Sequence, residues 1–354
     1  AGGNDTAAED VRWERRLADT GHCSALVRLV EGDTDLLMGH ATWDDYSKMT
    51  RIFKFYNLHF SGSGAAARRI ATSSYPGVVG STDNFFLTDS GLGIMETSLI
   101  ILDPSAWNYV EDFDARPSVP NFAHILAVTR LATGGADWAE RFVRRDTGTH
   151  ASQWLIVDYN QFEQLRPARD NALWVVEAVP GLVHAEDMTA HLREHRYFPS
   201  FNRPFFGPIR QRSGHSRAEE EYGALYSWAH NPRAQIFASD APNVRGPAGM
   251  RSLMEQNRGG AGHAVAARLD LDAQLRLPNG GIDAKVVGVC LQRSLAVQAL
   301  SGPSHATLQP FSWAGPGGVE AYPGWPHVGQ PTTWNFDYVQ LSPSGQGPVN
   351  DEVC

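Results

Sequence analysis

The sequence lacks the features that mark membrane-spanning and nucleic-acid-binding proteins. It contains no apolar run of about 18 residues, the length that a transmembrane helix requires. Lys and Arg number 30 against 39 Asp and Glu, so the formal net charge is -9, and the basic residues form no stripe or run. We therefore expect neither a transmembrane segment nor nucleic-acid binding.

Motifs of several familiar enzyme classes are missing as well. The chain has no G-x-S-x-G elbow, so a lipase of the α/β-hydrolase type is not expected. The glycine-rich segment 258–262 lacks the Lys-Ser/Thr of a phosphate-binding loop. His191 and His195 are four residues apart, but no HExxH glutamate accompanies them. The sequence thus gives no reason to expect a metal or an organic cofactor.

Cysteine is scarce, with Cys23, Cys290 and Cys354 as the three residues of this type. Because the number is odd, at least one thiol is free or pairs outside the chain. Cys290 ends an apolar segment, 284–290, that is typical of a buried strand, so we expect an inert buried thiol there. Cys354 is terminal, and we expect it to be free or paired elsewhere.

Residues 1–22 differ from the rest of the chain because they are polar and rich in charge. We expect them to be a precursor linker, the tail of a preceding N-terminal chain. They include one glycosylation sequon, Asn4-Asp5-Thr6, which favours passage through the secretory pathway. Residues 23–354 contain no low-complexity linker or repeat and are expected to form one domain.

Strand and helix patterns are mixed in this domain without regular βαβ alternation. The mixture predicts an α+β fold with large antiparallel sheets. Strands are expected at 24–30, 36–40, 153–159, 173–179 and 284–290, with several more between 68 and 101. Helices are expected at 44–56, 121–132, 136–144, 188–195 and 217–228. The Gly- and Pro-rich segment from 301 onward is expected to wrap the surface.

The segment Gly21-His22-Cys23-Ser24-Ala25-Leu26 is the strongest local pattern for chemistry. A cysteine that opens a buried strand after a flexible glycine suits an N-terminal nucleophile. In such an enzyme the thiol attacks the carbonyl that precedes it, a thioester forms, and water releases it. The freed α-amine, with an ordinary pKa of about 7.7–8.0, then serves as the base for the thiol. From spacing alone, a buried structural thiol remains the commoner interpretation.

Longer segments run in order over almost the whole chain: GHCSALVRL (21–29), HATWDDYSKMTRIFKFY (40–56), SSYPGVVGSTDNFFLTDSGLGIMETS (73–98), RLATGGADWAERF (130–142), GTHASQWLIVDY (148–159), PSFNRPFF (199–206), PRAQIF (232–237), GGIDAKV (280–286) and HVGQPTTWNF (327–336). Together they resemble the phospholipase B-like family, the lysosomal relatives of lamina ancestor. The resemblance implies the four-layer αββα sandwich of N-terminal-nucleophile hydrolases, two antiparallel sheets flanked by helices. It also implies cleavage between His22 and Cys23, a smaller N-terminal chain of the same precursor as partner, and a lysosomal or secreted location.

The resemblance also implies a set of site residues, matched motif by motif. They are Cys23 as the nucleophile, His40 and Trp43 of H-x-T-W, Thr97 of E-T-[ST], Asn202 of N-x-P, and Arg233 of P-R-A-Q-I-F. One departure concerns residues 257–276, which contain no cysteine where family members carry one in an insertion. A disulfide is therefore not expected in that region.

Each of these side chains has a chemical role and a structural alternative. The Asn202 amide can donate to an oxyanion, or the residue can simply form a turn. Arg233 can hold a carboxylate or phosphate and orient its neighbours, or form an ion pair at the edge of the core. His40 can tune the thiol and Trp43 can wall the pocket with an N–H donor, or both can be structural. Thr97 can equally be an ordinary strand residue.

The site residues predict an acyl-bond hydrolase in which the Cys23 thiolate attacks an ester or amide carbonyl and water cleaves the thioester. The family name implies deacylation of phospholipids, and the mechanism suits linear amides equally. The expected substrate is a lipid or another small molecule, and a homodimer is compatible with the resemblance. The alternative is a lysosomal or secreted interaction protein that is processed but catalytically idle, because self-cleavage does not prove turnover.

Overall fold

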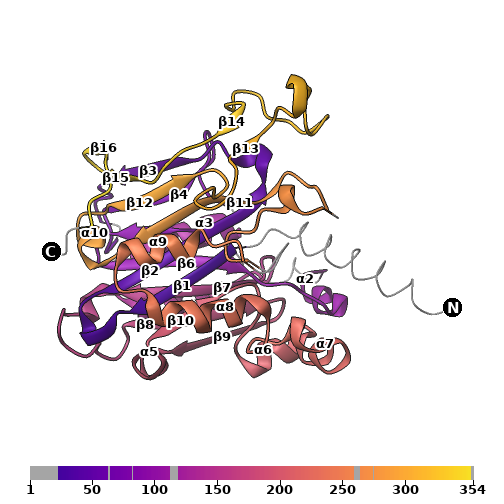
Figure 1. Ribbon diagram of the computed structural model, residues 1–354. Coiled ribbons are helices and arrows are strands. Elements are labelled where there is room, and N and C mark those ends of the chain that lie inside the picture. The colour runs from indigo at the N-terminus through magenta and orange to yellow at the C-terminus, as the bar shows by residue number, and fades with distance from the viewer. Residues whose placement is uncertain are drawn as a thin grey trace.

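The computed structural model describes residues 23–62, 64–81, 83–111, 119–258, 264–273 and 275–351. The expectations for residues 1–22, for the bond between His22 and Cys23, and for Cys354 lie outside the described residues. Within these ranges the chain forms two seven-stranded sheets and one short two-stranded sheet (Figure 1).

The first large sheet carries the candidate nucleophile. Its strand order is β10-β1-β2-β11-β12-β15-β16, and all neighbours pair antiparallel. The strands span β1 Cys23–Leu29, β2 Leu36–Asp45, β10 Tyr197–Ser200, β11 Asn279–Val287, β12 Val297–Ser301, β15 Val339–Ser342 and β16 Gly345–Gly347. β1 is buried along its whole length because β10 and β2 flank it and both of its faces are covered.

The second large sheet is an antiparallel meander in which each strand pairs with the next, from β3 to β9. Its strands span β3 Ile52–Asn57, β4 Arg69–Ser74, β5 Phe86–Thr88, β6 Leu92–Ser98, β7 Ser152–Asp158, β8 Leu173–Val179 and β9 Leu182–Asp187. β6, the central strand of this sheet, packs against β1, so the second sheet lies over the strand that carries the candidate nucleophile.

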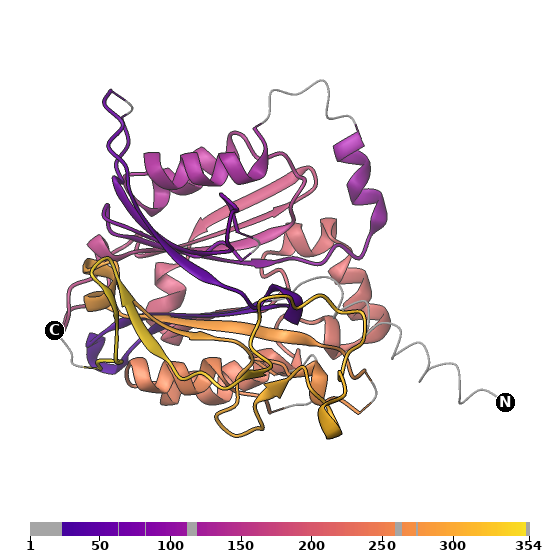
Figure 2. The same ribbon diagram turned by 90° about the horizontal axis from the view of Figure 1, so that it is seen from above.

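Helices cover the outer faces of both sheets, as Figure 2 shows from above. They span α2 Asn108–Glu111, α3 Asn121–Leu131, α4 Gly135–Val143, α5 Thr189–His195, α6 Gly207–Arg212, α7 His215–Tyr222, α8 Pro232–Asp240, α9 Pro247–Met254 and α10 Val289–Arg293. α3 and α4 lie on the second sheet, and α8 and α9 lie on the first.

Three apolar clusters hold these four layers together. Val27 of β1 and Leu155 of β7 both belong to the cluster between the sheets. Leu26, the neighbour of Val27, points to the opposite face and joins Phe237 of α8, because successive strand residues alternate between faces. Trp138 of α4 belongs to the third cluster, on the second sheet. The predicted αββα sandwich of two antiparallel sheets is confirmed.

The helix expected at 44–56 is wrong. β2 continues to Asp45, a single 3-10 turn spans Tyr46–Lys48, and β3 begins at Ile52. Phe53 and Phe55 lie two residues apart with their ring centroids 5.4 Å from each other, which fits the two-residue period of a strand. Pairing with β4 along the whole of β3 therefore overrides the helical spacing of the apolar residues.

The expectations for Cys290 are also wrong. The residue is disulfide-bonded rather than a free thiol, and it is only half-buried. β11 ends at Val287, and the Asp35 carboxylate accepts a hydrogen bond of 2.9 Å from the Val289 N–H. That bond satisfies a backbone donor at the first turn of α10, so the apolar segment changes from strand to helix before it reaches the cysteine.

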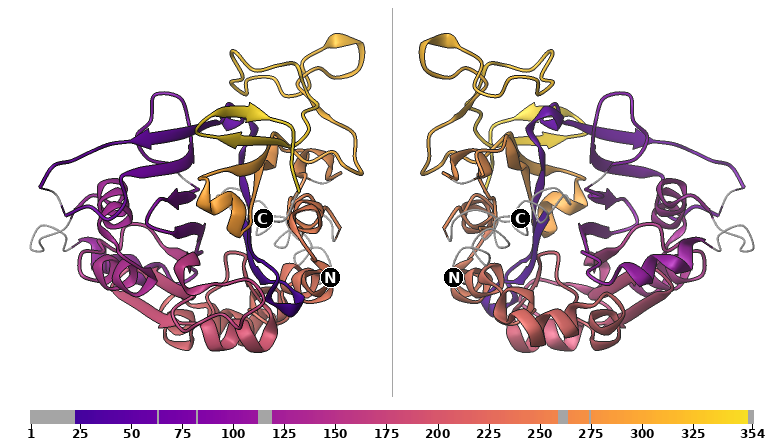
Figure 3. Two further views of the ribbon diagram at one scale, coloured as in Figure 1. Left: turned by 90° about the vertical axis from the view of Figure 1, so that its left-hand side faces the viewer. Right: turned by 90° about the vertical axis from the view of Figure 1, so that its right-hand side faces the viewer.

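The C-terminal segment does more than wrap the surface. β13 Phe311–Ser312 and β14 Thr333–Trp334 form the two-stranded sheet, while β15 and β16 extend the edge of the first large sheet. Figure 3 shows this segment, in yellow, gathered on one side of the sandwich. No described helix is long and apolar enough to cross a membrane.

Candidate active site

Cys23 lines a cavity of about 450 Å³ at the end of β1. Antiparallel pairing sets it opposite Thr42 of β2, and the residue is only 4% exposed. It is a free thiol, and Trp43, Ser98 and His150 line the same cavity. The cysteine singled out by the sequence therefore faces a space of the size that small-molecule sites have.

Arg233 reaches the backbone of Cys23 from the helix layer. Its helix, α8, starts with Pro232 in the first turn, and the Asn231 side chain caps it by accepting a 3.0 Å bond from the Arg233 N–H. The cap fixes the arginine at the helix start, where its guanidinium stacks 4.6 Å from the centre of the Trp43 ring. The sequence thus builds a rigid position for a buried cation beneath β1.

The guanidinium of Arg233 binds four acceptors that surround the nucleophile. One terminal nitrogen donates to the Cys23 carbonyl oxygen at 3.0 Å and to the Ser24 hydroxyl at 3.2 Å. The other donates to the Phe201 carbonyl oxygen and to the Asn202 side-chain oxygen, both at 2.8 Å. All four acceptors are uncharged, and burial lowers the pKa of Arg233 to about 9. A buried positive charge therefore lies against the nucleophile with no carboxylate bonded to it among the described residues.

Asn202 and Thr97 tie the two sheets together beside this cation. Asn202 follows β10 in the left-handed region, with φ of 66°, a conformation that asparagine tolerates. Its amide nitrogen donates to the Ser98 carbonyl oxygen at 2.7 Å, which leaves its second hydrogen for another acceptor. Thr97 shares a 2.6 Å hydrogen bond with the Ser200 hydroxyl and is buried without lining the cavity.

His40 and Trp43 lie on β2, next to β1. Trp43 walls the cavity, but its ring N–H donates to the Val265 carbonyl oxygen at 2.8 Å, so that donor is occupied. His40 is fully buried, with its Nε2 bonded to the Glu96 carbonyl oxygen at 2.8 Å. Burial and the Lys285 cation lower the pKa of His40 to about 4, so the ring is neutral at physiological pH.

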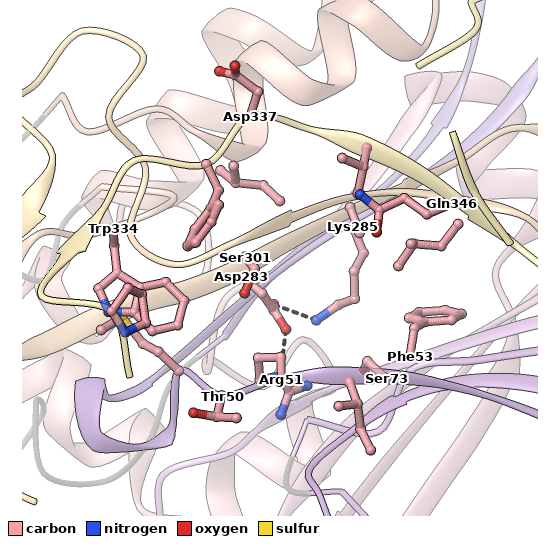
Figure 4. A pocket seen from close by; sticks show the side chains of 18 of the residues that line it. Thr50, Arg51, Phe53, Ser73, Asp283, Lys285, Ser301, Trp334, Asp337 and Gln346 are labelled. Atoms are coloured by element: carbon pink, nitrogen blue, oxygen red, sulfur yellow. Dashed lines mark hydrogen bonds and ion pairs between the residues drawn. The ribbon is translucent and has the colours of Figure 1, made fainter. Parts of the chain in front are cut away.

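A buried charge network that the sequence did not reveal lies on the inner face of these strands. The Lys285 ammonium bonds the Thr42 hydroxyl at 2.7 Å, Asp83 at 2.9 Å and Asp283 at 2.6 Å. Arg51 bridges the same two carboxylates at 2.6 and 2.9 Å. Figure 4 shows Arg51, Asp283 and Lys285 from a neighbouring cavity of about 610 Å³. Because Thr42 pairs with Cys23, this network holds β2 in place directly beside the nucleophile.

The surroundings of Cys23 favour the neutral thiol. Burial and then the Glu96 carboxylate raise the pKa of the thiol well above its ordinary value, with a smaller contribution from Asp83. A hydrogen bond from the Trp43 backbone N–H and the Lys285 charge act in the opposite direction. Attack by this sulfur therefore requires a base that removes its proton.

One group of residues in the described part of the chain could in principle hold a metal ion. His40, Asp83 and Asp283 place their ligand atoms within 4.8 Å of one another. The Lys285 ammonium, however, already bonds both carboxylates and supplies the cluster's positive charge. These side chains therefore form an internal ion-pair network, and the geometry does not favour a metal centre.

Two ionisable residues of the site, Glu96 and His150, were not predicted from the sequence. Glu96 lies on β6, and His150 lies in the loop before β7 and lines the cavity with Cys23. Both fall within segments that carry the family resemblance, METS and GTHASQW. That location was the available signal, but only the fold brings the two residues together, because 53 residues separate them in sequence.

Two solved structures share a distant likeness with this chain. A Caenorhabditis elegans N-acylethanolamine-hydrolyzing acid amidase ortholog has a TM-score of 0.43 and 10% identity, covering 75% of this chain and 92% of that one. A conjugated bile acid hydrolase mutant from Clostridium perfringens has a TM-score of 0.42 and 12% identity, covering 78% and 89%. Likenesses at this level do not bear on function.

Sequence comparison gives close and extended matches. Phospholipase B-like protein A of Dictyostelium discoideum is 35% identical over 349 residues, which cover 94% of this chain and 59% of that protein. Phospholipase B-like protein C of the same organism is also 35% identical, with 92% and 60% covered. The chain thus spans about three fifths of the length of these relatives. The sequence model described as Phospholipase B matches residues 3–341, and the chain belongs to the phospholipase B family.

Proposed function

We propose that residues 23–354 form the large chain of an acyl-bond hydrolase in which Cys23 is the nucleophile. The observation that carries the proposal is the position of Cys23, which opens β1 at the cavity while Arg233 binds its carbonyl oxygen. Membership of the phospholipase B family supports hydrolysis as the reaction class. Cleavage between His22 and Cys23 would leave a new α-amine on Cys23 itself, beside its own thiol and at the start of β1.

The α-amine supplies the base that the buried thiol requires. It takes the thiol proton as the sulfur attacks the carbonyl carbon of the substrate, and a thioester forms as the leaving group takes up a proton at its nitrogen or oxygen and departs. The Trp43 backbone N–H favours the developing thiolate. Water then hydrolyses the thioester, and the proton held by the amine returns to the sulfur. No step of this sequence needs a metal or an organic cofactor.

Asn202 is the proposed oxyanion donor. Arg233 holds its side-chain oxygen at 2.8 Å, and the Ser98 carbonyl oxygen holds one amide hydrogen at 2.7 Å. These two bonds fix the amide plane, so the remaining hydrogen has a set direction before substrate binds. A donor preorganised in this way contributes more than one that must reorient during the reaction. In this scheme Arg233 is a positioning residue.

The cavity has both apolar and polar lining, which suits an acyl compound with a polar leaving group. Phe122 and Ile125 of α3 contribute apolar surface, and Asn84 and Thr149 contribute polar groups. We propose a phospholipid ester or a linear amide as the substrate class. The family resemblance further supports a smaller N-terminal chain as partner and a lysosomal or secreted location.

Hydrolysis of a panel of phospholipids and linear amides by the protein tests the proposal. Cys23→Ala should abolish release of fatty acid from phospholipids and of amine from linear amides, and it should leave the bond between His22 and Cys23 uncleaved. Thermal unfolding of the variant checks that it folds. Unchanged turnover in Cys23→Ala would exclude Cys23 as the nucleophile. A cleaved wild-type protein that hydrolyses no member of the panel would favour the catalytically idle interaction protein.

A further inference from the structure

His150 and Glu96 form a pair at the wall of the Cys23 cavity. The Nε2 atom of His150 lies 3.1 Å from a carboxylate oxygen of Glu96. The Glu96 side chain is fully buried, whereas the His150 side chain is 32% exposed and lines the cavity. A carboxylate that holds one ring nitrogen fixes the orientation of the ring and favours its protonated form. The Nδ1 atom makes no hydrogen bond to the described residues, so it is the atom left for a ligand.

The charge of Glu96 is poorly compensated by anything except His150. One of its carboxylate oxygens is buried without a hydrogen-bond partner, and the other bonds only the imidazole. This carboxylate is also the charged group that most strongly opposes ionisation of Cys23. A bare anion at this position would disfavour the thiolate that the reaction needs. A protonated His150 removes that penalty, which ties the ionisation of the pair to the state of the nucleophile.

We propose that His150, oriented by Glu96, is the acid that protonates the leaving group during attack by Cys23. This inference rests on the proposed function. As the sulfur–carbon bond forms and the thiol proton passes to the α-amine, the carbon–nitrogen or carbon–oxygen bond of the substrate breaks. The leaving atom takes the proton from Nδ1 of His150. In the second step water adds to the thioester carbon and gives its proton to the neutral His150, while the α-ammonium returns its proton to the departing sulfur.

The charges around His150 agree with an acid that is protonated at the start of the cycle. Burial acts to lower the pKa of His150, but Glu96 through its charge and hydrogen bond, and Asp146 through its charge, raise it above the ordinary value. The remaining charged groups that line the cavity are Asp44 and Lys48, which bond each other at 2.8 Å. The ring therefore keeps its proton to a higher pH than a free imidazole does, as a general acid requires.

The dependence on the leaving group tests this role. Two substrates share one acyl group: a linear alkyl amide, whose nitrogen must be protonated to leave, and an activated aryl ester, whose phenolate leaves unprotonated. We expect His150→Gln to lower kcat/KM for the amide by about 10²- to 10⁴-fold and to change that for the ester by only a few-fold. His184→Gln is the matched control, because His184 lies 3.2 Å from Glu186, is 34% exposed and is absent from the cavity lining. It should leave both rates unchanged.

A second variant probes the pair without removing the imidazole. Glu96→Gln keeps the shape of the side chain but removes the charge that raises the pKa of His150. In the profile of kcat/KM against pH, the alkaline limb for the amide should therefore move to lower pH. The alkaline limb for the aryl ester should stay in place. This measurement also decides the matter if His150→Gln does not fold.

The outcomes separate this inference from the proposed function. Equal losses on amide and ester in His150→Gln, or no loss on either, would overturn the role of His150 while Cys23 remains the nucleophile. An alkaline limb that stays in place in Glu96→Gln would do the same. Wild-type protein that hydrolyses neither substrate, or a Cys23→Ala variant that hydrolyses both, would instead overturn the proposed function.

Discussion

Replacement of Arg233 by methionine should destabilise the protein by an amount that its hydrogen bonds predict. The change removes four bonds of 2.8–3.2 Å and leaves four buried acceptors without this donor. At about 1 kcal/mol for each bond the loss is about 4 kcal/mol. Removal of a buried cation that bonds no carboxylate offsets part of this loss, since burying a charge is unfavourable. We expect a net loss of about 2–4 kcal/mol in the free energy of unfolding.

Thermal unfolding followed by near-ultraviolet circular dichroism measures this loss. For a chain of this size, about 2 °C per kcal/mol converts the estimate into a Tm lower by about 4–8 °C. Arg212→Met is the matched control, because Arg212 is half-buried and also donates only to uncharged oxygens, the carbonyls of Pro180 and Ala106, at 3.0 and 3.2 Å. It should lose about half as much. Arg233→Lys keeps the positive charge but lacks the two-pronged guanidinium, and its Tm should be close to that of Arg233→Met. A Tm of Arg233→Met within about 1 °C of wild type would refute the reasoning.

Three further changes test the packing around the site. Lys285→Met leaves Arg51 as the shared cation of Asp83 and Asp283, and it should lower the free energy of unfolding, measured with denaturant, by about 3–5 kcal/mol. The control Lys48→Met removes an exposed ion pair and should lower it by less than about 1 kcal/mol. Although burial opposes it, Arg51 and Lys285 hold the pKa of Asp83 well below its ordinary value, so Asp83 contributes stability above pH about 4 that is lost as the pH falls further. The slope of unfolding free energy against pH in that range should be smaller in Asp83→Asn, and an unchanged slope would contradict the assignment. Gly280 has φ of 138° and a Cβ there would overlap the Ala267 carbonyl oxygen, so Gly280→Ala should lose more stability than Gly345→Ala, which has φ of 126° but open space around it.

The layers of the fold were predictable because the apolar pattern of each long element is strong. The strand expected at 173–179 and the helices expected at 121–132 and 136–144 appear within a residue or two of their predicted bounds. The segment at 44–56 was not predictable from spacing, because its apolar residues fit both periods and only the partner strand β4 decides between them. The apolar neighbours of Cys290 indicated a buried thiol, so its disulfide was not predicted. The short helix around it was not predicted either, because apolar residues fit a strand end and a short helix equally well.

The candidate site was predictable only in part. The residues that the family resemblance implies do converge, with Arg233 bonded to both Cys23 and Asn202. Their catalytic roles stay predictions. Lys285 and Asp283 stand out in sequence only as charges inside a buried strand, and their partners Asp83 and Arg51 lie far away along the chain. Long-range charge pairing of this kind depends on the stacking of the two sheets, which no local pattern encodes.

Trapping of the acyl-enzyme tests the central claim most directly. Protein matured at acidic pH is incubated with an activated acyl ester, quenched, digested and analysed by mass spectrometry. We predict a peptide that begins at Cys23 and carries the acyl group as a thioester that hydroxylamine removes. A peptide in which His22 is still joined to an unmodified Cys23, from protein that nevertheless hydrolyses the ester, would contradict the account.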